Sequence, residues 1–251
     1  MDSFLNHLLQ YVISLLIVHV LFANGQNSTI QSALIVVPPL FDEIQVLTMA
    51  DVLRRAEIQV TLAAMTNSSS TWEISGQHGL SIVADGQLPT TTEPMMDMII
   101  IPSGFQTYDY MINHSAFGQL LKSYAASQKY VAAMGTGVGV LGVFGIYAGS
   151  QVTAHPSVES TLSPNYRIIK QDIVVDGKLF TARATVNALA FALKVVENGR
   201  STLLAIELSS GLTSQKKLHL GVRGSVPRLI RSQIEALAIG AILLFPEGII
   251  Y

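Results

Sequence analysis

Short apolar runs and amphipathic segments alternate along the middle of the chain. The runs at residues 33–37 and 97–101 are continuous, which predicts parallel strands covered on both faces, and residues 58–63 predict a further strand. Three groups of apolar residues recur at helical spacing: Ile44, Leu47, Ala50 and Leu53; Phe117, Leu120, Leu121 and Tyr124, with Ser115 as the expected cap; and Ala188, Leu189, Ala192, Leu193 and Val196, with Gly199 as the expected terminator. Strands that alternate with helices indicate an α/β layered fold with a mainly parallel sheet.

A glycine-rich stretch follows the apolar run at residues 130–134, which predicts a buried strand, a tight turn and a helix start. Such a turn exposes one side chain at the carboxyl end of a parallel sheet, beside free backbone N–H groups and a helix N-terminus. The residue at the tip is Gly135, which has no side chain. On spacing alone, the favoured interpretation is that these glycines ease a crowded turn. Further along, residues 173–180 predict a hairpin with an Asp-Gly turn.

The two ends of the chain differ from its middle. An apolar run at residues 8–23 followed by small residues predicts a signal peptide over residues 1–25, and then a short linker at 26–32. Because no Lys or Arg precedes the run, a retained signal anchor is the alternative. After the main domain at residues 33–211, the extension at 212–251 is basic and then apolar. It predicts a helix packed on the domain or on a partner subunit, with weak membrane-surface contact as the alternative.

Composition restricts the chemistry more than it restricts the fold. The 251 residues are 49% hydrophobic, which is enough for a sizeable core, and they include no cysteine. This absence excludes disulfides, thiolate metal ligands and thiol nucleophiles. The net charge of -2 gives the protein no broad positive electrostatic potential that would attract nucleic acid. His78, His114 and His219 show no metal-ligand spacing, so we expect no metal and no cofactor.

Three N-x-[ST] sequons follow the predicted leader, at Asn27, Asn67 and Asn113. They are meaningful as glycan acceptors only if the chain enters the secretory pathway. Asn67 lies in a polar Ser-rich loop and is the first expected to be used. The sequence therefore predicts a secreted or lumenal glycoprotein.

Several stretches together resemble the ThiJ/PfpI superfamily, in the branch that contains the Parkinson's-disease-associated protein deglycase. The resemblance runs from about Ala33 to Leu208. Its markers are the first strand with Asp42-Glu43, the helix end at 51–56, residues 78–85, the strand from Asp97 to Ser103-Gly104, the elbow at Gly135, residues 152–156 and residues 176–179. It implies a flavodoxin-like α/β sandwich that usually forms a homodimer.

The resemblance also implies a site, and this chain departs from it. The family's elbow cysteine falls on Gly135, and the glutamate that hydrogen-bonds the thiol falls on Gln45. The family's histidine is kept as His155, and its Gly-Gly turn becomes Ser103-Gly104, whose backbone N–H donors we expect to remain. The family's Arg-Gly-Pro turn reads Arg-Ala-Thr at 183–185 here, which adds bulk.

The sequence therefore predicts a catalytically inactive member that acts as a binding or structural module. The alternative is a diverged glyoxalase, deglycase or hydrolase, related to the oxidative-stress proteins of the family, that uses water or Thr136 with His155 as the base. The favoured interpretation of His155 is a buried, hydrogen-bonded residue before Pro156. We expect Asp42, Glu43 and Asp109 to be solvated charges, and Trp72 to be a core or interface aromatic.

Overall fold

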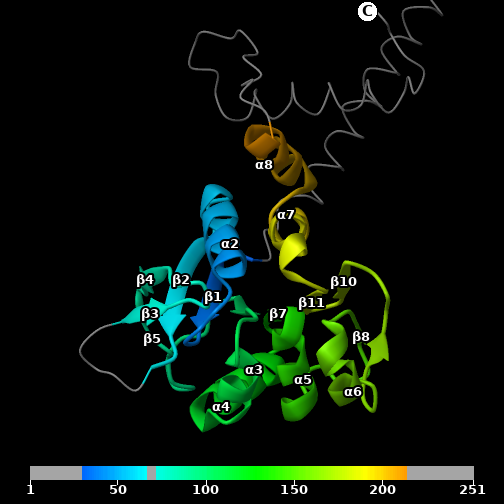
Figure 1. Ribbon diagram of the computed structural model, residues 1–251. Coiled ribbons are helices and arrows are strands. Elements are labelled where there is room, and N and C mark those ends of the chain that lie inside the picture. Colours follow the sequence, from blue (N-terminus) through cyan, green and yellow to red (C-terminus); the bar gives the residue numbers. More distant parts are fainter. Residues whose placement is uncertain (1–29, 67–71, 214–251) are drawn as a thin grey trace, which may run out of the picture. The chain divides into compact units, whose positions relative to one another are not determined.

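A seven-stranded sheet lies at the centre of the computed structural model, which describes residues 30–66 and 72–213 (Figure 1). The strand order is β10 (Ile173–Asp176), β11 (Leu179–Ala182), β7 (Tyr130–Met134), β6 (Met98–Ile101), β1 (Ser32–Val37), β2 (Gln59–Ala64) and β5 (Gly86–Gln87). All neighbouring pairs are parallel except β10 with β11. The predicted α/β fold with a mainly parallel sheet is confirmed.

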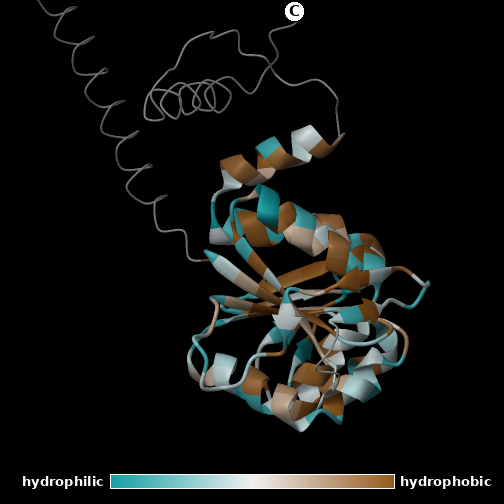
Figure 2. Ribbon diagram, turned by 90° about the vertical axis from the view of Figure 1, so that its left-hand side faces the viewer, coloured by the Kyte–Doolittle hydropathy of each residue, from teal (hydrophilic) through white to brown (hydrophobic). Residues whose placement is uncertain are grey.

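Helices cover both faces of this sheet (Figures 1 and 2). One layer contains α2 (Glu43–Arg55) and α7 (Ala188–Gly199), with α8 (Thr202–Thr213) packed on α7. The other contains α3 (Thr107–Ile112), α4 (Ser115–Ala126), α5 (Gly139–Phe144) and α6 (Glu159–Leu162). Shorter elements are β3 (Glu73–Ser75), β4 (Ser81–Val83), β8 (Gln151–Val152), β9 (Arg167–Ile168), and the 3₁₀ turns η1 (Gly135–Val138), η2 (Pro156–Val158) and η3 (Thr185–Asn187).

The continuous apolar runs have a direct structural reason. Successive side chains of β1 point to opposite faces, so Ile35 belongs to the core under α2 and α7, whereas Leu34 and Val36 belong to the core over α4 and α5. Figure 2 shows the hydrophobic strands enclosed between the two helix layers. Both faces of each central strand are therefore buried, and no polar alternation is needed.

The helical spacing predicts the helices correctly but not all of their buried faces. All four predicted residues of α4 are buried. In α2, Ile44 and Leu47 are 61% and 41% exposed, and the buried face instead includes Val46 and Met49. In α7, Leu189 is 41% exposed. Both helices thus carry apolar residues on a second, outward side.

The backbone geometry corrects two local predictions and confirms a third. The N-cap of α4 is His114, whose Nδ1 accepts a hydrogen bond from the Phe117 N–H, and not Ser115. In the hairpin, Asp176 pairs with Leu179, so the loop residues are Gly177-Lys178. Gly177 takes the left-handed conformation, with φ +58°, which suits the first position of a two-residue hairpin loop. The helix terminator Gly199 is confirmed at the end of α7.

The folded part begins before the expected domain start at residue 33. Ile30 is fully buried and packs against Gly199, and β1 begins at Ser32. The predicted signal peptide, the sequons at Asn27 and Asn67, and most of the extension at 212–251 lie outside the described residues. Within residues 30–66 and 72–213, no helix combines the length and apolar character that a membrane crossing requires.

Candidate functional site

The predicted elbow lies where β7 ends and η1 begins. Gly135 is buried and has φ +57°, a conformation that favours glycine. Loops that follow β1, β6 and β11 reach the same carboxyl edge of the sheet, the usual place for a site in a parallel α/β fold. The strand, turn and helix start are confirmed.

Four side chains from these loops form a closed hydrogen-bonded group beside Gly135, which we call the site cluster: Asp42, Gln45, Ser103 and Thr185. The Ser103 N–H donates to Gln45 Oε1 at 2.7 Å. Because a backbone N–H can only donate, this bond fixes the orientation of the amide, and Gln45 Nε2 then donates to Ser103 Oγ at 2.6 Å and to Thr185 Oγ1 at 3.0 Å. The Thr185 hydroxyl donates to Asp42 Oδ2.

The helix start holds this group in place. Asp42 caps α2, since its Oδ1 accepts from the Gln45 N–H at 3.1 Å. Gln45 is fully buried, and Asp42 and Ser103 are 4% and 8% exposed. The cluster is therefore satisfied within the protein rather than open to a ligand.

The Ser103 hydroxyl occupies the space next to the elbow tip. An ideal Cβ added at Gly135 would lie 2.7 Å from Ser103 Oγ and 3.6 Å from Gln45 Nε2. Where the family resemblance implies glycine at 103 and cysteine at 135, this chain has serine and glycine. The side chain that the resemblance implies at position 135 is absent, and the space beside it is taken by the side chain at position 103. The sequence does not reveal this exchange, because Ser103 is predicted there only as part of a backbone turn.

The backbone donors of the Ser103-Gly104 turn are not both free, contrary to expectation. The Ser103 N–H is used by Gln45. At Gly104, an added Cβ would overlap the carbonyl oxygen of Leu40, so this glycine is required by the close approach of two loops. The turn thus serves packing at least as much as ligand binding.

His155 and Thr136 do not form a base and nucleophile pair. His155 is exposed, contrary to the prediction of burial, and its Nδ1 lies 2.8 Å from Ser157 Oγ and accepts from the Ser157 N–H at 3.3 Å, capping η2. The Thr136 hydroxyl is buried, and within the described residues it has no hydrogen-bond partner. No hydrogen bond joins the two side chains in this part of the chain.

A second group, the hairpin cluster, contains Glu43, Gly76 and His78. The Glu43 carboxylate accepts from the His78 N–H at 2.6 Å and lies 3.3 Å from His78 Nδ1. Burial raises the pKa of Glu43, but hydrogen bonds from the His78 and Glu43 backbone N–H groups, and the His78 side chain, outweigh it and leave the pKa below 4.5. An added Cβ at Gly76 would overlap this carboxylate.

The exposure of the predicted surface residues differs from one residue to the next. Asp42 and Glu43 are both 4% exposed, so the prediction that they are solvated is wrong, whereas Asp109 is exposed as expected. Trp72 is 41% exposed and does not lie in the core. Across residues 30–66 and 72–213, no group of three or more His, Asp or Glu side chains could hold a metal ion.

The fold and the site together define an α/β sandwich protein built around a strand-to-helix elbow, here without a nucleophile at its tip. A sequence profile of the DJ-1/PfpI family matches residues 31–198, and the chain belongs to this family. The predicted resemblance is confirmed.

Individual relatives cover most of the chain. Protein dj-1beta of Drosophila melanogaster is 31% identical over 183 residues, which is 72% of this chain and 96% of the relative. Glutathione-independent glyoxalase DJR-1.2 of Caenorhabditis elegans is 33% identical over 169 residues, covering 66% and 88%. The crystal structure of Drosophila melanogaster DJ-1beta superposes with a TM-score of 0.68 at 29% identity, covering 74% of this chain and 100% of that one.

Proposed function

We propose that this chain is a non-catalytic member of the DJ-1/PfpI family that acts as a binding or structural module in the secretory pathway. The observation that carries the proposal is the filling of the site by the Ser103 hydroxyl, which lies beside a Gly135 that has no nucleophile. The predicted leader and the three sequons support the secretory location.

Ser103 itself is not an activated nucleophile. A hydroxyl group attacks a carbonyl carbon only when an adjacent base removes its proton. Within the described residues, the Ser103 hydroxyl accepts a hydrogen bond from Gln45 Nε2, an amide nitrogen that cannot take up a proton. The hydroxyl therefore lacks the base that covalent chemistry requires.

Turnover of methylglyoxal by the purified full chain tests the proposal. We expect the rate to equal the solvent background, with the Caenorhabditis elegans glyoxalase as the positive control. Activity that Thr136→Val or His155→Ala abolishes would refute the non-catalytic function. It would favour the second candidate, a diverged glyoxalase-type enzyme, which the 33% identity to that glyoxalase supports.

Restoring the thiol tests why the site is inactive. We expect Gly135→Cys alone to be poorly tolerated, because its side chain meets Ser103 Oγ. Combined with Ser103→Gly and Gln45→Glu, the new cysteine has space, and the carboxyl group in its protonated form can donate a hydrogen bond to the thiolate. At a pH where that carboxyl group is protonated, the cysteine should alkylate faster than a free thiol. A folded triple variant with an unreactive cysteine would contradict the proposed geometry.

A homodimer is the proposed assembly. The outward apolar residues Ile44 and Leu47 lie on α2, which packs against α7, and Val186 and Leu189 near the start of α7 are 87% and 41% exposed. Apolar side chains gathered on two neighbouring helices are typical of an interface. We expect Leu47→Glu to give monomers in sedimentation velocity, whereas Val143→Glu, a 45% exposed position on the opposite helix layer, should leave the dimer intact. Equal effects would contradict this interface.

A further inference from the structure

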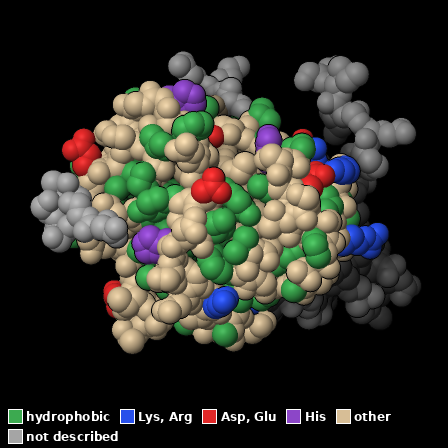
Figure 3. All heavy atoms as spheres, turned by 60° about the horizontal axis from the view of Figure 1, so that its bottom comes forward, with side chains coloured by type: hydrophobic (Ala, Val, Ile, Leu, Met, Phe, Trp, Pro, Cys, Tyr) green, Lys and Arg blue, Asp and Glu red, His purple; other side chains and the backbone are tan. Residues whose placement is uncertain are grey.

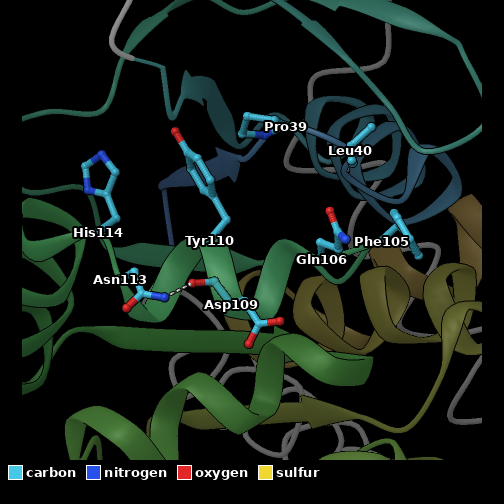
Figure 4. A pocket seen from close by; sticks show the side chains of 8 residues that line it. All are labelled: Pro39, Leu40, Phe105, Gln106, Asp109, Tyr110, Asn113 and His114. Atoms are coloured by element: carbon cyan, nitrogen blue, oxygen red, sulfur yellow. Dashed lines mark hydrogen bonds between the residues drawn. The ribbon is translucent and has the colours of Figure 1, made fainter.

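A groove of about 600 Å³ runs along α3, between this helix and the loop that follows β1 (Figure 4). It belongs to the α3–α6 side of the molecule, where Figure 3 shows scattered hydrophobic side chains with few charged ones between them. In Figure 4, Asn113 and His114 lie at one end of the groove, and Phe105 and Leu40 at the other. The groove is separate from the site cluster.

The walls of the groove combine an apolar surface with free polar groups. Phe105 is 62% exposed, and Leu40 lies beside it. The side chains of Gln106 and Asp109 line the groove, and neither bonds to another described residue. No Lys or Arg is among the lining residues. A ring with one apolar face and several hydroxyl groups, such as a sugar, suits this combination better than an anion does.

Asn113 supplies a covalent attachment point at the edge of this groove. It is the acceptor of the sequon Asn113-His114-Ser115, and its side chain is exposed where α3 ends. Its Nδ2 donates to the Asp109 carbonyl oxygen at 2.8 Å. Since the amide nitrogen carries two hydrogens, one can be replaced by a sugar while the other keeps this bond.

We propose that Asn113 carries an N-linked glycan whose first sugars lie in the groove along α3. In the transfer, Asn113 Nδ2 attacks the anomeric carbon of an oligosaccharide linked to a polyprenyl diphosphate. The new C–N bond replaces the C–O bond to the diphosphate, which leaves, and the amide loses one proton. The inference rests on entry into the secretory pathway, which is part of the proposed function.

Site mapping tests the modification. The full chain is expressed in secretory eukaryotic cells, and occupancy of all three sequons is measured by glycopeptide mass spectrometry. Ser115→Ala removes the acceptor sequence but keeps Asn113 and its bond to Asp109, whereas Ser115→Thr is the matched control that keeps the sequon. We expect a glycan at Asn113 in the wild type and in Ser115→Thr, and none in Ser115→Ala.

The possible failures are distinguishable. A chain that carries a glycan at Asn27 or Asn67 but none at Asn113 overturns this inference and leaves secretory entry standing. A chain without any glycan overturns both.

Release of the glycan from the native protein tests its position. We expect peptide N-glycosidase to release the Asn113 glycan several-fold faster from Phe105→Ala than from the wild type, because the groove loses the exposed phenyl ring. Val143→Ala, at an exposed position on α5 that does not line the groove, should not change the rate. Equal release from both variants overturns the placement in the groove.

Discussion

Two adjacent carboxylates at the start of α2 are used in different ways. Asp42 belongs to the site cluster, whose polar atoms bond one another, and Gln45 at its centre is fully buried. Glu43 belongs to the hairpin cluster and bonds the backbone and imidazole of His78, a side chain that is 78% exposed. One carboxylate thus completes an internal network, and the other ties a surface hairpin to the helix.

This difference shows how the carboxyl edge of the sheet can stay packed without a side chain at the elbow tip. The site cluster fills the space beside Gly135 with donors and acceptors that bond one another, so the carboxyl edge of the sheet remains packed. The hairpin cluster keeps a buried carboxylate that still titrates. The substitutions below change the charge of the site cluster, the packing of the hairpin cluster, and the titration of Glu43.

The largest expected effect is that of Gln45→Glu. The substitution removes two N–H donors from Ser103 and Thr185 and places a second carboxyl group beside Asp42, whose Oδ2 lies 3.4 Å from Gln45 Nε2. The new carboxylate keeps the Ser103 N–H donor, but no member of the site cluster is a cation, and an uncompensated buried charge costs about 3–5 kcal/mol of unfolding free energy. Urea denaturation at pH 7 measures this loss.

Acidification tests whether the loss of stability in Gln45→Glu is due to the charge of the new carboxyl group or to its shape. Once protonated, the new carboxyl group can again donate one hydrogen bond, so the deficit relative to the wild type should shrink as the pH falls toward 5. A Gln45→Glu protein that is as stable as the wild type at pH 7 would show that the site cluster is not closed.

A smaller loss is expected from Gly76→Ala in the hairpin cluster. The added methyl group overlaps the Glu43 side chain, which is buried and cannot move away without losing its bond to His78. Overpacking of this kind costs about 1–3 kcal/mol. Gly86→Ala is the matched control, since no atom lies within 4 Å of a Cβ there and its φ is not positive. Equal denaturation midpoints for the two variants would contradict the contact.

Much of this architecture could be predicted from the sequence because burial on two sides leaves a clear pattern. The strands at 33–37 and 98–101 are continuous apolar runs because both faces of the sheet are covered. The elbow was predictable because a turn with φ +57° favours glycine at position 135. These signals are local, and the sequence contains them completely.

The errors concern contacts between distant segments. The spacing of Ile44 and Leu47 is compatible with either side of α2, and only packing against α7 and the sheet decides which side is buried. The sequence predicts Asp42 as a solvated charge, because nothing local shows that Thr185, more than a hundred residues away, bonds to it. Ser103 is likewise predicted only as a turn residue, because its short distance from Gly135 depends on the fold.

The smallest expected effect is a pH dependence due to Glu43. Its pKa in the folded state is below the ordinary value of 4.5, so the folded protein holds the ionised form more strongly than the unfolded chain does. The contribution to stability is therefore complete above pH 4.5 and is lost as the pH falls through the lowered pKa. Urea midpoints measured between pH 6 and pH 3 should decrease with acidification.

The variant Glu43→Gln isolates this contribution. The pKa values of Asp97 and Glu159 are also lowered, so the wild type loses stability with acid at more than one position. Glutamine keeps an oxygen that accepts from the His78 N–H but does not titrate. We expect its stability to fall less steeply below pH 4.5 than that of the wild type. If the two slopes are the same, the hairpin cluster does not hold the ionised carboxylate, and the contrast with the site cluster fails.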